Sequence, residues 1–186
     1  IDSGSTSTDV VILDKNREII SSVIMPTGAG AANGAERALE EALKQAKLNR
    51  EDLDAVVTTG YGRTAISDGD KSFTEITCHA RGAHFLDPRV RTVVDIGGQD
   101  SKVVSLIAQN KHTDDIVHGL NKAVAAKTAS LVKRVGGEEA YMMTGGVAQN
   151  KGLVKTLEER LGTSLVISPK SQLCGALGAA LFAADM

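Results

Sequence analysis

The chain has 186 residues, of which 42% are hydrophobic and 24% are charged, and its net charge is −2. This size and balance indicate a folded globular protein of one large domain or two small ones. The near-neutral charge argues against nucleic acid as a partner, and the longest apolar stretch, residues 175–186, is too short to span a bilayer. The two cysteines exclude a disulfide scaffold and favour a reducing compartment, so we expect a cytoplasmic protein without membrane partners.

Strand-like and helix-like segments alternate along the chain. Two β-branched runs, residues 9–14 and 17–25, predict a hairpin, and the spacing of apolar residues then predicts a helix over 35–46 with Asn33 as its N-cap. The same patterns predict strands over 55–60, 92–98, 140–146 and 164–168, and helices over 74–86, 113–135, 152–161 and 172–185. This alternation indicates an α/β protein with a mixed sheet.

Two similar motifs divide the chain. DSGST (residues 2–6) and DIGGQD (residues 95–100) each follow a short strand, and they begin 93 residues apart. We therefore expect two related subdomains, residues 1–88 and 89–186. The second half passes to its long helix without the return strand that the first half has, so we expect a segment to be missing near residues 104–105.

Each of these motifs brings an aspartate to a glycine turn. Backbone amides in such turns approach phosphate oxygens closely, and the hydroxyls of Ser5 and Thr6 add donors. Asp2 and Asp95 could hold Mg²⁺ through water or orient an attacking water. One turn alone is more typical of an ordinary hairpin, but two in corresponding places predict a site that grips one polyphosphate from both sides. The expected ligands are Gly4, Ser5, Thr6, Gly97, Gly98 and Gln99.

A third motif, MTGGVAQN (residues 143–150), reads as a strand, a Gly-Gly turn and a helix start. Small residues there would let a ribose or a flat ring lie against the backbone near a helix N-terminus, although a plain strand-to-helix connection is an equal alternative. The contacts expected here are Gly145, Gly146 and Gln149. Arg63, in TGYGR, could either position phosphate or form an ion pair, and the sequence leaves both open.

Six motifs in this order carry a family resemblance: DSGST, TGYGR, ITCHARGA, VVDIGGQDSKV, MTGGVAQN and SPKSQLCGALGAAL. Together they resemble the ATPase activators of 2-hydroxyacyl-CoA dehydratases and the ATPase subunits of benzoyl-CoA reductases, within the acetate kinase/sugar kinase/Hsp70/actin superfamily. The resemblance covers nearly the whole chain. It implies two ribonuclease H-like subdomains with a nucleotide cleft between them.

The resemblance also implies an activity. DSGST and DIGGQD would be the first and second phosphate loops and TGGVAQN the adenosine motif, with Mg²⁺ near Asp2 and Asp95 and with Asp95 or Gln99 orienting the hydrolytic water. The family implies a homodimer bridging one [4Fe-4S] cluster, in which ATP hydrolysis drives an electron from a ferredoxin or flavodoxin to the partner dehydratase or reductase. It implies neither nucleic acid nor a membrane as a partner.

The chain departs from the family at two places. The cluster motifs of the family, which resemble NDKCAAGTG and SSTCTVFAES, are absent, and Cys78 and Cys174 read as buried small residues, so the chain contains no predicted cluster ligands. Asp9 stands where the family usually has lysine. Two other functions therefore stay open: a small-molecule kinase of the same superfamily, and a non-catalytic, nucleotide-gated module that binds a partner.

Overall fold

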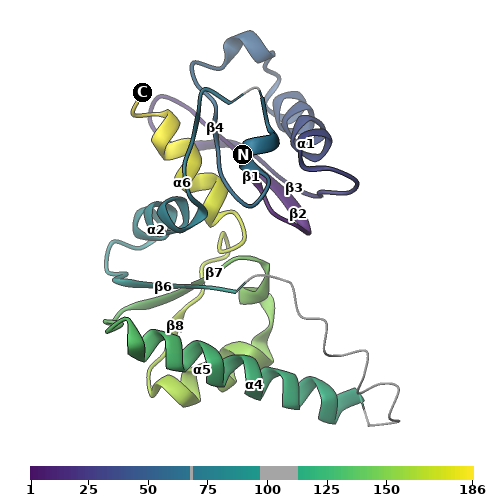
Figure 1. Cartoon of the computed structure of the whole chain (residues 1–186). Coiled ribbons are helices and arrows are strands. Elements are labelled where there is room, and N and C mark those ends of the chain that lie inside the picture. The colour runs from purple at the N-terminus through teal and green to yellow at the C-terminus, as the bar shows by residue number, and fades with distance from the viewer. Residues whose placement is uncertain (68, 97–112) are drawn as a thin grey trace. The chain divides into compact units, whose positions relative to one another are not determined.

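A computed structural model of the chain describes residues 1–67, 69–96 and 113–186 (Figure 1). The segment 97–112 lies outside the described residues, and with it the predicted second phosphate loop. The helices are α1 (Ala31–Ala46), α2 (Glu75–Leu86), α4 (Thr113–Arg134), α5 (Lys151–Leu161) and α6 (Cys174–Ala183). The strands are β1 (Asp2–Ser3), β2 (Ser7–Leu13), β3 (Ile19–Pro26), β4 (Val57–Thr58), β5 (Lys71–Ser72), β6 (Thr92–Asp95), β7 (Tyr141–Thr144) and β8 (Leu165–Val166).

The chain forms two compact units. One comprises Ile1–Pro88 together with Pro169–Met186, and the other comprises Arg89–Ser168. The closing helix, which the sequence analysis placed in the second half, therefore packs with the first. Among the helices of the described residues, none is both long and apolar enough to cross a membrane.

The first unit is built on β1, β2 and β3, which pair antiparallel in that order. A bridge between Asp2 and Thr59 joins β1 in parallel to the segment that contains β4, and β4 pairs in parallel with β5. The hairpin that the sequence predicts is present. Strands of both orientations meet in this unit, so the predicted mixed α/β architecture is confirmed.

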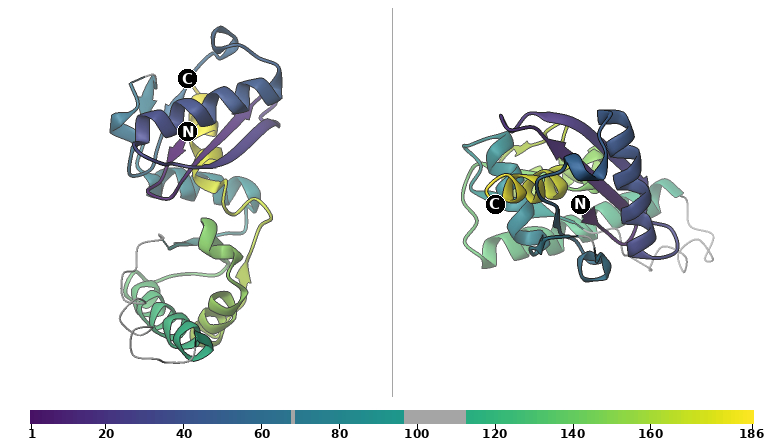
Figure 2. Two further views of the ribbon diagram at one scale, coloured as in Figure 1. Left: turned by 90° about the vertical axis from the view of Figure 1, so that its right-hand side faces the viewer. Right: turned by 90° about the horizontal axis from the view of Figure 1, so that it is seen from above.

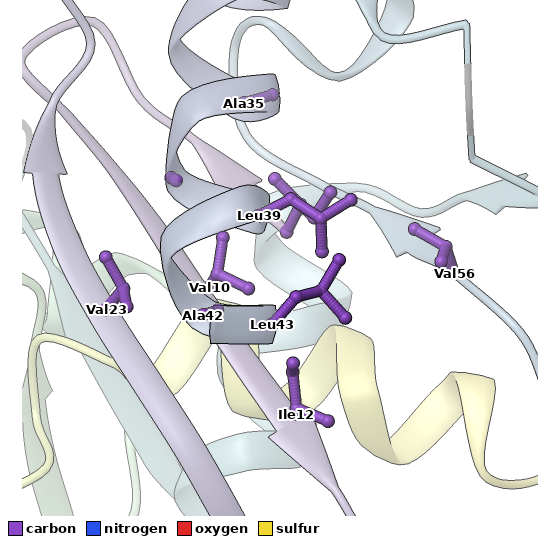
Figure 3. Close-up of a cluster of buried hydrophobic side chains, with 10 residues drawn as sticks. Val10, Ile12, Val23, Ala35, Leu39, Ala42, Leu43 and Val56 are labelled. Atoms are coloured by element: carbon purple, nitrogen blue, oxygen red, sulfur yellow. The ribbon is translucent and has the colours of Figure 1, made fainter. Parts of the chain in front are cut away.

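Side chains of β2 alternate between two helical layers. Val10 and Ile12 pack with Leu39 and Leu43 of α1 in the cluster that Figure 3 shows. Val11, between them, packs instead with α6. The period of two along the strand therefore places α1 over one face of the sheet and α6 over the other. Figure 2 shows α1 running along the strands of this unit.

Local signals explain most helix ends. Thr74 caps α2 by accepting a hydrogen bond from the Thr77 amide at 3.3 Å, and α5 ends at Gly162, whose φ is 75°. The prediction for α1 is wrong at its start. The helix begins at Ala31 after Gly30, without a side-chain cap, so Asn33 lies inside the first turn.

The second unit is a parallel sheet of β6, β7 and β8, in that order. Helices α4 and α5 pack on it, and the shared core includes Val94, Ala125, Met143 and Leu157. Parallel strands buried in this way are expected to be nearly continuous in apolar residues, as the sequence YMMT of β7 is.

Helices α2 and α6 of the first unit pack backbone to backbone. A Cβ at Gly178 would collide with the carbonyl of Cys78, and a Cβ at Gly82 would collide with the carbonyl of Cys174. Glycine at both positions is therefore a steric requirement of this helix pair rather than a choice of backbone conformation.

Gly178→Ala should lower the free energy of unfolding by about 1–3 kcal/mol, because the added methyl group overpacks the contact between α2 and α6. The matched control is Gly119→Ala in α4. Apart from the neighbouring backbone of the helix itself, no described atom lies within 4 Å of the Cβ that this substitution adds. Alanine there should stabilise the helix by up to about 1 kcal/mol. Urea denaturation of both variants measures the two effects. Equal midpoints for Gly178→Ala and the unchanged protein would contradict the packing described.

Candidate functional site

The first half-site lies at the end of β1. Asp2 is paired with Asp9 of β2, and the turn that follows is closed by a hydrogen bond of 2.9 Å from the Gly4 amide to the Ser7 carbonyl. Thr27 donates to the Gly4 carbonyl at 2.8 Å and holds the turn from beneath. Ser5 and Thr6 are exposed at its tip. The predicted residues Asp2, Gly4, Ser5 and Thr6 therefore lie in one fixed turn, with both hydroxyls accessible.

The Asp2 carboxylate is enclosed by backbone and by one histidine. A Cβ on Gly60 would lie 2.5 Å from Oδ1, and a Cβ on Gly175 would collide with Oδ2. On the same side, Nε2 of His79 lies 3.5 Å from Oδ2. Two glycines and a histidine, from three segments far apart in the sequence, thus fix this carboxylate. The sequence analysis assigned a role to none of the three.

Gly60 and Gly175 could have been found from the motifs that contain them. TGYGR and SPKSQLCGALGAAL were recognised as family motifs but were given no function apart from Arg63. The structure gives each motif the same role, which is to bring a residue without a side chain against Asp2. Arg63 also serves this turn, because its Nη1 donates to the Gly60 carbonyl at 2.9 Å.

Asp9 is the buried neighbour of Asp2. Its side chain lies opposite Asp2 across the strand pair, the residue is only 5% exposed, and its Oδ1 has no hydrogen-bond partner among the described residues. Burial, with a smaller contribution from the charge of Asp2, raises the pKa of Asp9 to about 7. Near neutral pH the residue therefore carries much less than a full negative charge. The reduced charge makes an acid at position 9 compatible with the predicted phosphate-binding role of the neighbouring turn.

The second half-site lies at the end of β6, in the second unit. Asp95 stands in parallel register with Thr144 of β7, and the Thr144 hydroxyl donates to Asp95 Oδ1 at 3.2 Å. Gly145 follows with a φ of 77°, and a Cβ there would lie 2.6 Å from the same oxygen. The next strand of the sheet therefore holds the Asp95 carboxylate.

The two half-sites share one arrangement, which we call the Asp–Thr–Gly seat. In the first unit it consists of Asp2, Thr59 and Gly60, and in the second of Asp95, Thr144 and Gly145. In both, the aspartate and the threonine face each other in parallel register, and the glycine has a positive φ, of 87° and 77°. The predicted internal repeat therefore extends to a second pair of motifs, TTGYG and MTGGV. The sequence analysis did not recognise that these two motifs correspond to each other.

The predicted adenosine motif follows directly from the second seat. Gly146–Gln149 forms a single turn, and Asn150 then caps α5 by accepting from the Leu153 amide at 3.1 Å. Gly146 and Gln149 are exposed, while Gly145 is half-buried against Asp95. Gly97, Gly98 and Gln99 lie outside the described residues, and their expected roles stay predictions.

Both cysteines lie in the core of the first unit. Cys78 of α2 and Cys174 of α6 are fully buried, and the Cys174 thiol donates to the His79 carbonyl at 3.4 Å. Burial raises the pKa of the Cys78 thiol. The prediction that both serve as buried small residues is confirmed.

Asp9→Asn should flatten the pH dependence of stability. The native state holds the Asp9 proton up to a pKa of about 7 whereas the unfolded chain loses it near 3.8, so the Asp9 contribution to stability falls as pH rises from about 4 to 7. At pH 8 the variant should be more stable than the unchanged protein by about 2 kcal/mol or more, since one pKa unit corresponds to about 1.4 kcal/mol. Denaturation curves recorded from pH 4.5 to 8 measure the free energy of unfolding of this variant. Glu40→Gln, at an exposed position on α1, is the control that removes a carboxylate from the surface. An Asp9→Asn curve parallel to that control would contradict the assignment.

Comparisons with known proteins place the chain. The family model described as the BadF/BadG/BcrA/BcrD ATPase family matches residues 1–114 and 103–183. The 2-hydroxyisocaproyl-CoA dehydratase activator of Clostridioides difficile is 33% identical over 100% of this chain and 94% of its own length. The (R)-2-hydroxyglutaryl-CoA dehydratase activating ATPase of Acidaminococcus fermentans is 34% identical over 98% of this chain and 95% of its own length.

A solved structure of the activator of the 2-hydroxyisocaproyl-CoA dehydratase from Clostridium difficile, with bound ADPNP, has the same fold. It superposes with a TM-score of 0.88 at 32% identity, covering 99% of this chain and 92% of that one. The predicted fold, two ribonuclease H-like subdomains of the actin/Hsp70/sugar-kinase type, is thereby confirmed. The chain belongs to the BadF/BadG/BcrA/BcrD ATPase family.

Proposed function

We propose that the chain is an ATP-hydrolysing activator that acts on a 2-hydroxyacyl-CoA dehydratase or a related CoA-ester reductase. The observation that carries the proposal is the Asp–Thr–Gly seat, which occurs once in each unit beside a predicted phosphate or adenosine motif. The relatives, whose names describe dehydratase activators and an activating ATPase, support the same conclusion.

ATP is the substrate that these two half-sites suit. The exposed hydroxyls of Ser5 and Thr6 would donate to phosphate oxygens, and Gly4 keeps their turn tight enough for backbone amides to approach. Gly146 and Gln149 leave an exposed backbone for the adenosine. Gly97 and Gly98 would complete the phosphate contacts as the second loop.

The two aspartates suit Mg²⁺. Magnesium binds through one or two carboxylates together with substrate phosphates and water, and Asp2 and Asp95 each present a fixed carboxylate. When bound, the ion would neutralise charge on the phosphates. Asp95 would orient the hydrolytic water with Gln99, and the hydrogen bond from Thr144 would hold its carboxylate in place for that role.

The cysteines of this chain do not suit an iron–sulfur cluster. A cluster takes about four thiolates, and the chain has two cysteines, both buried in helices of the first unit. These residues therefore supply no electron-transfer step. The low-potential electron delivery that the family resemblance implies would need ligands from elsewhere.

Comparison with a relative supports a position in the chain for a segment that would carry the cluster ligands. The alignment with the activator from Clostridioides difficile spans 250 positions against 186 residues here, so at least 64 positions of it have no counterpart in this chain. The two stretches matched by the family model overlap at residues 103–114. We propose that the missing positions fall there, next to the predicted break at 104–105, and that the segment they form carries the cluster.

The remaining assignments follow from the activator role. A homodimer in the cytoplasm would take electrons from a ferredoxin or flavodoxin and would pass them to the partner enzyme, with ATP binding as the switch between conformations. Only the full-length activator, with its cluster segment, would complete this cycle.

Asp95→Asn should lower the ATP hydrolysis rate by about 100-fold or more, because the amide cannot accept the proton of the attacking water. Its affinity for ATP should change by less than about tenfold. Phosphate release and calorimetric titration separate the two effects, with Glu159→Gln, exposed on α5 in the same unit, as the control. Undiminished turnover in Asp95→Asn would overturn the catalytic assignment, and tight binding without turnover in the unchanged protein would favour the non-catalytic module.

Anaerobic reconstitution with iron and sulfide should leave the 186-residue chain without a cluster, as judged by its visible absorption and its electron paramagnetic resonance spectrum. The same chain should still bind ATP, because neither cysteine is among the residues proposed to contact the nucleotide or Mg²⁺. The double variant Cys78→Ala/Cys174→Ala is the matched control for non-specific iron. A stable spectrum that this double variant loses would contradict the proposal.

A further inference from the structure

The predicted adenosine motif is held at both of its ends. At its start, Gly145 lies in the second Asp–Thr–Gly seat. At its end, the side chain of Asn150 makes two hydrogen bonds: Oδ1 accepts from the Leu153 amide at 3.1 Å, and Nδ2 donates to Oδ1 of Asn121 at 3.3 Å. The first of these bonds caps α5, whereas the second joins the motif to a different helix, α4. The proposed function assigns no part to Asn121.

Asn121 is a buried polar residue in the first half of α4. It is 8% exposed, and α4 packs against α5 in the second unit (Figure 1). Its Nδ2 lies so close to α5 that a Cβ on Gly152 would be only 2.8 Å away. The same face of α4 continues with the apolar residues Ala125, Ala129 and Val132. Burying an amide among them costs free energy unless it is hydrogen-bonded, so the contact with Asn150 explains the polar side chain here better than packing does.

The two hydrogen bonds fix the direction in which the Asn150 amide faces. A backbone N–H needs an acceptor, so the amide presents its oxygen to Leu153 and its nitrogen to α4. α4 must then offer an acceptor, and Oδ1 of Asn121 is that acceptor. An apolar side chain at position 121 would leave the Asn150 nitrogen without this partner, and the Asn150 side chain would be free to rotate away from the cap.

The main chain of Asn150 also ends the turn of the adenosine motif. Its amide donates to the Val147 carbonyl at 2.9 Å and closes the turn Gly146–Gln149. One residue therefore closes this turn through its backbone and anchors it to two helices through its side chain. A shift of Asn150 would move the exposed backbone that the proposed function gives to the adenosine.

We propose that Asn121 is a positioning residue for the nucleoside part of ATP, because its side-chain oxygen holds Asn150 and thereby the turn on which the adenosine lies. This inference rests on the proposed function, in which that turn receives the adenosine. The phosphates are assigned there to other segments of the chain. Loss of the Asn121 oxygen should therefore weaken ligands that carry a nucleoside and spare ligands that consist of phosphate alone.

Two substitutions at this position separate the hydrogen bond from the size of the side chain. Asn121→Leu removes the acceptor and keeps a similar size, whereas Asn121→Asp keeps an acceptor in the same place. Calorimetric titration with Mg²⁺ present gives the dissociation constants of ATP and of tripolyphosphate, which has three phosphates and no nucleoside. Asn121→Leu should weaken ATP by about fivefold, as the loss of one hydrogen bond does, and tripolyphosphate by less than about twofold. Asn121→Asp should bind both within about twofold of the unchanged protein, because a carboxylate accepts from Asn150 and is favoured beside the first turn of α5.

Hydrogen exchange tests the hold on the turn without any nucleotide. The Leu153 amide should exchange at least about threefold faster in Asn121→Leu, because its acceptor on Asn150 is no longer held in place. Asn121→Asp should keep the slow rate. Val132→Ala is the control for a simple loss of stability, because it removes buried methyl groups about three turns further along the same helix. It should lower the urea midpoint and leave the affinity for ATP unchanged.

Gly152→Ala reaches the same contact from α5. The added methyl group would push the Asn121 side chain away and should weaken ATP as Asn121→Leu does. In an Asn121→Ala background the methyl group meets no such side chain, so Gly152→Ala should then change the ATP dissociation constant by less than about twofold. A full effect of Gly152→Ala in that background would contradict the proposal.

Other results would overturn it as well. These are an unchanged affinity for ATP in Asn121→Leu, an equal weakening of ATP and tripolyphosphate, a loss in Asn121→Asp as large as in Asn121→Leu, and an unaltered exchange rate at Leu153. Failure of the unchanged protein to bind either ligand is a different result. It would overturn the activator role, and the nucleoside part of this proposal with it, whatever the exchange rates.

Discussion

The close approach of a glycine to an aspartate carboxylate is the constraint on which both half-sites depend. A strand delivers the aspartate, and the neighbouring parallel strand ends in Thr-Gly, so that a residue with no side chain meets the carboxylate oxygen. A methyl group in that place would lie 2.5 or 2.6 Å from the oxygen, closer than a Cβ atom approaches a non-bonded atom in folded proteins. In each seat the glycine leaves room for the carboxylate in a place where a side chain would displace it.

The first seat is more crowded than the second. Gly175 at the start of α6 and His79 of α2 also contact Asp2, and the same two helices pack so tightly that each needs a glycine against the other's backbone. The tight pairing of α2 with α6 therefore connects the core of the first unit to the position of one carboxylate. Packing and function share the same residues here, and changes in the core would be felt at the turn that carries Ser5 and Thr6.

The sequence predicted the fold class and the turn after Asp2 because both depend on local patterns. The β2–β3 hairpin follows from β-branched runs, and the turn after Asp2 follows from its glycine and serine. The roles of Gly60, Gly175 and His79 could not be predicted in this way, because each acts on Asp2 from a segment remote in sequence. The N-cap assigned to Asn33 failed because this residue, although a good capping type, is the third residue of a helix that begins after a glycine. Asp9 was noted as a departure, but only its burial beside Asp2 shows why its charge is largely suppressed.

The equilibrium dissociation constant of ATP for Gly60→Ala and Gly145→Ala tests the central claim most directly. Each substitution should displace one carboxylate and weaken ATP binding in the presence of Mg²⁺ by about tenfold or more. Gly136→Ala provides the control, because Gly136 also has a positive φ, of 66°. No described atom other than its chain neighbours lies within 4 Å of the Cβ that this substitution adds. It should cost similar backbone strain and leave the affinity unchanged. Equal dissociation constants for all three variants and the unchanged protein would contradict the account.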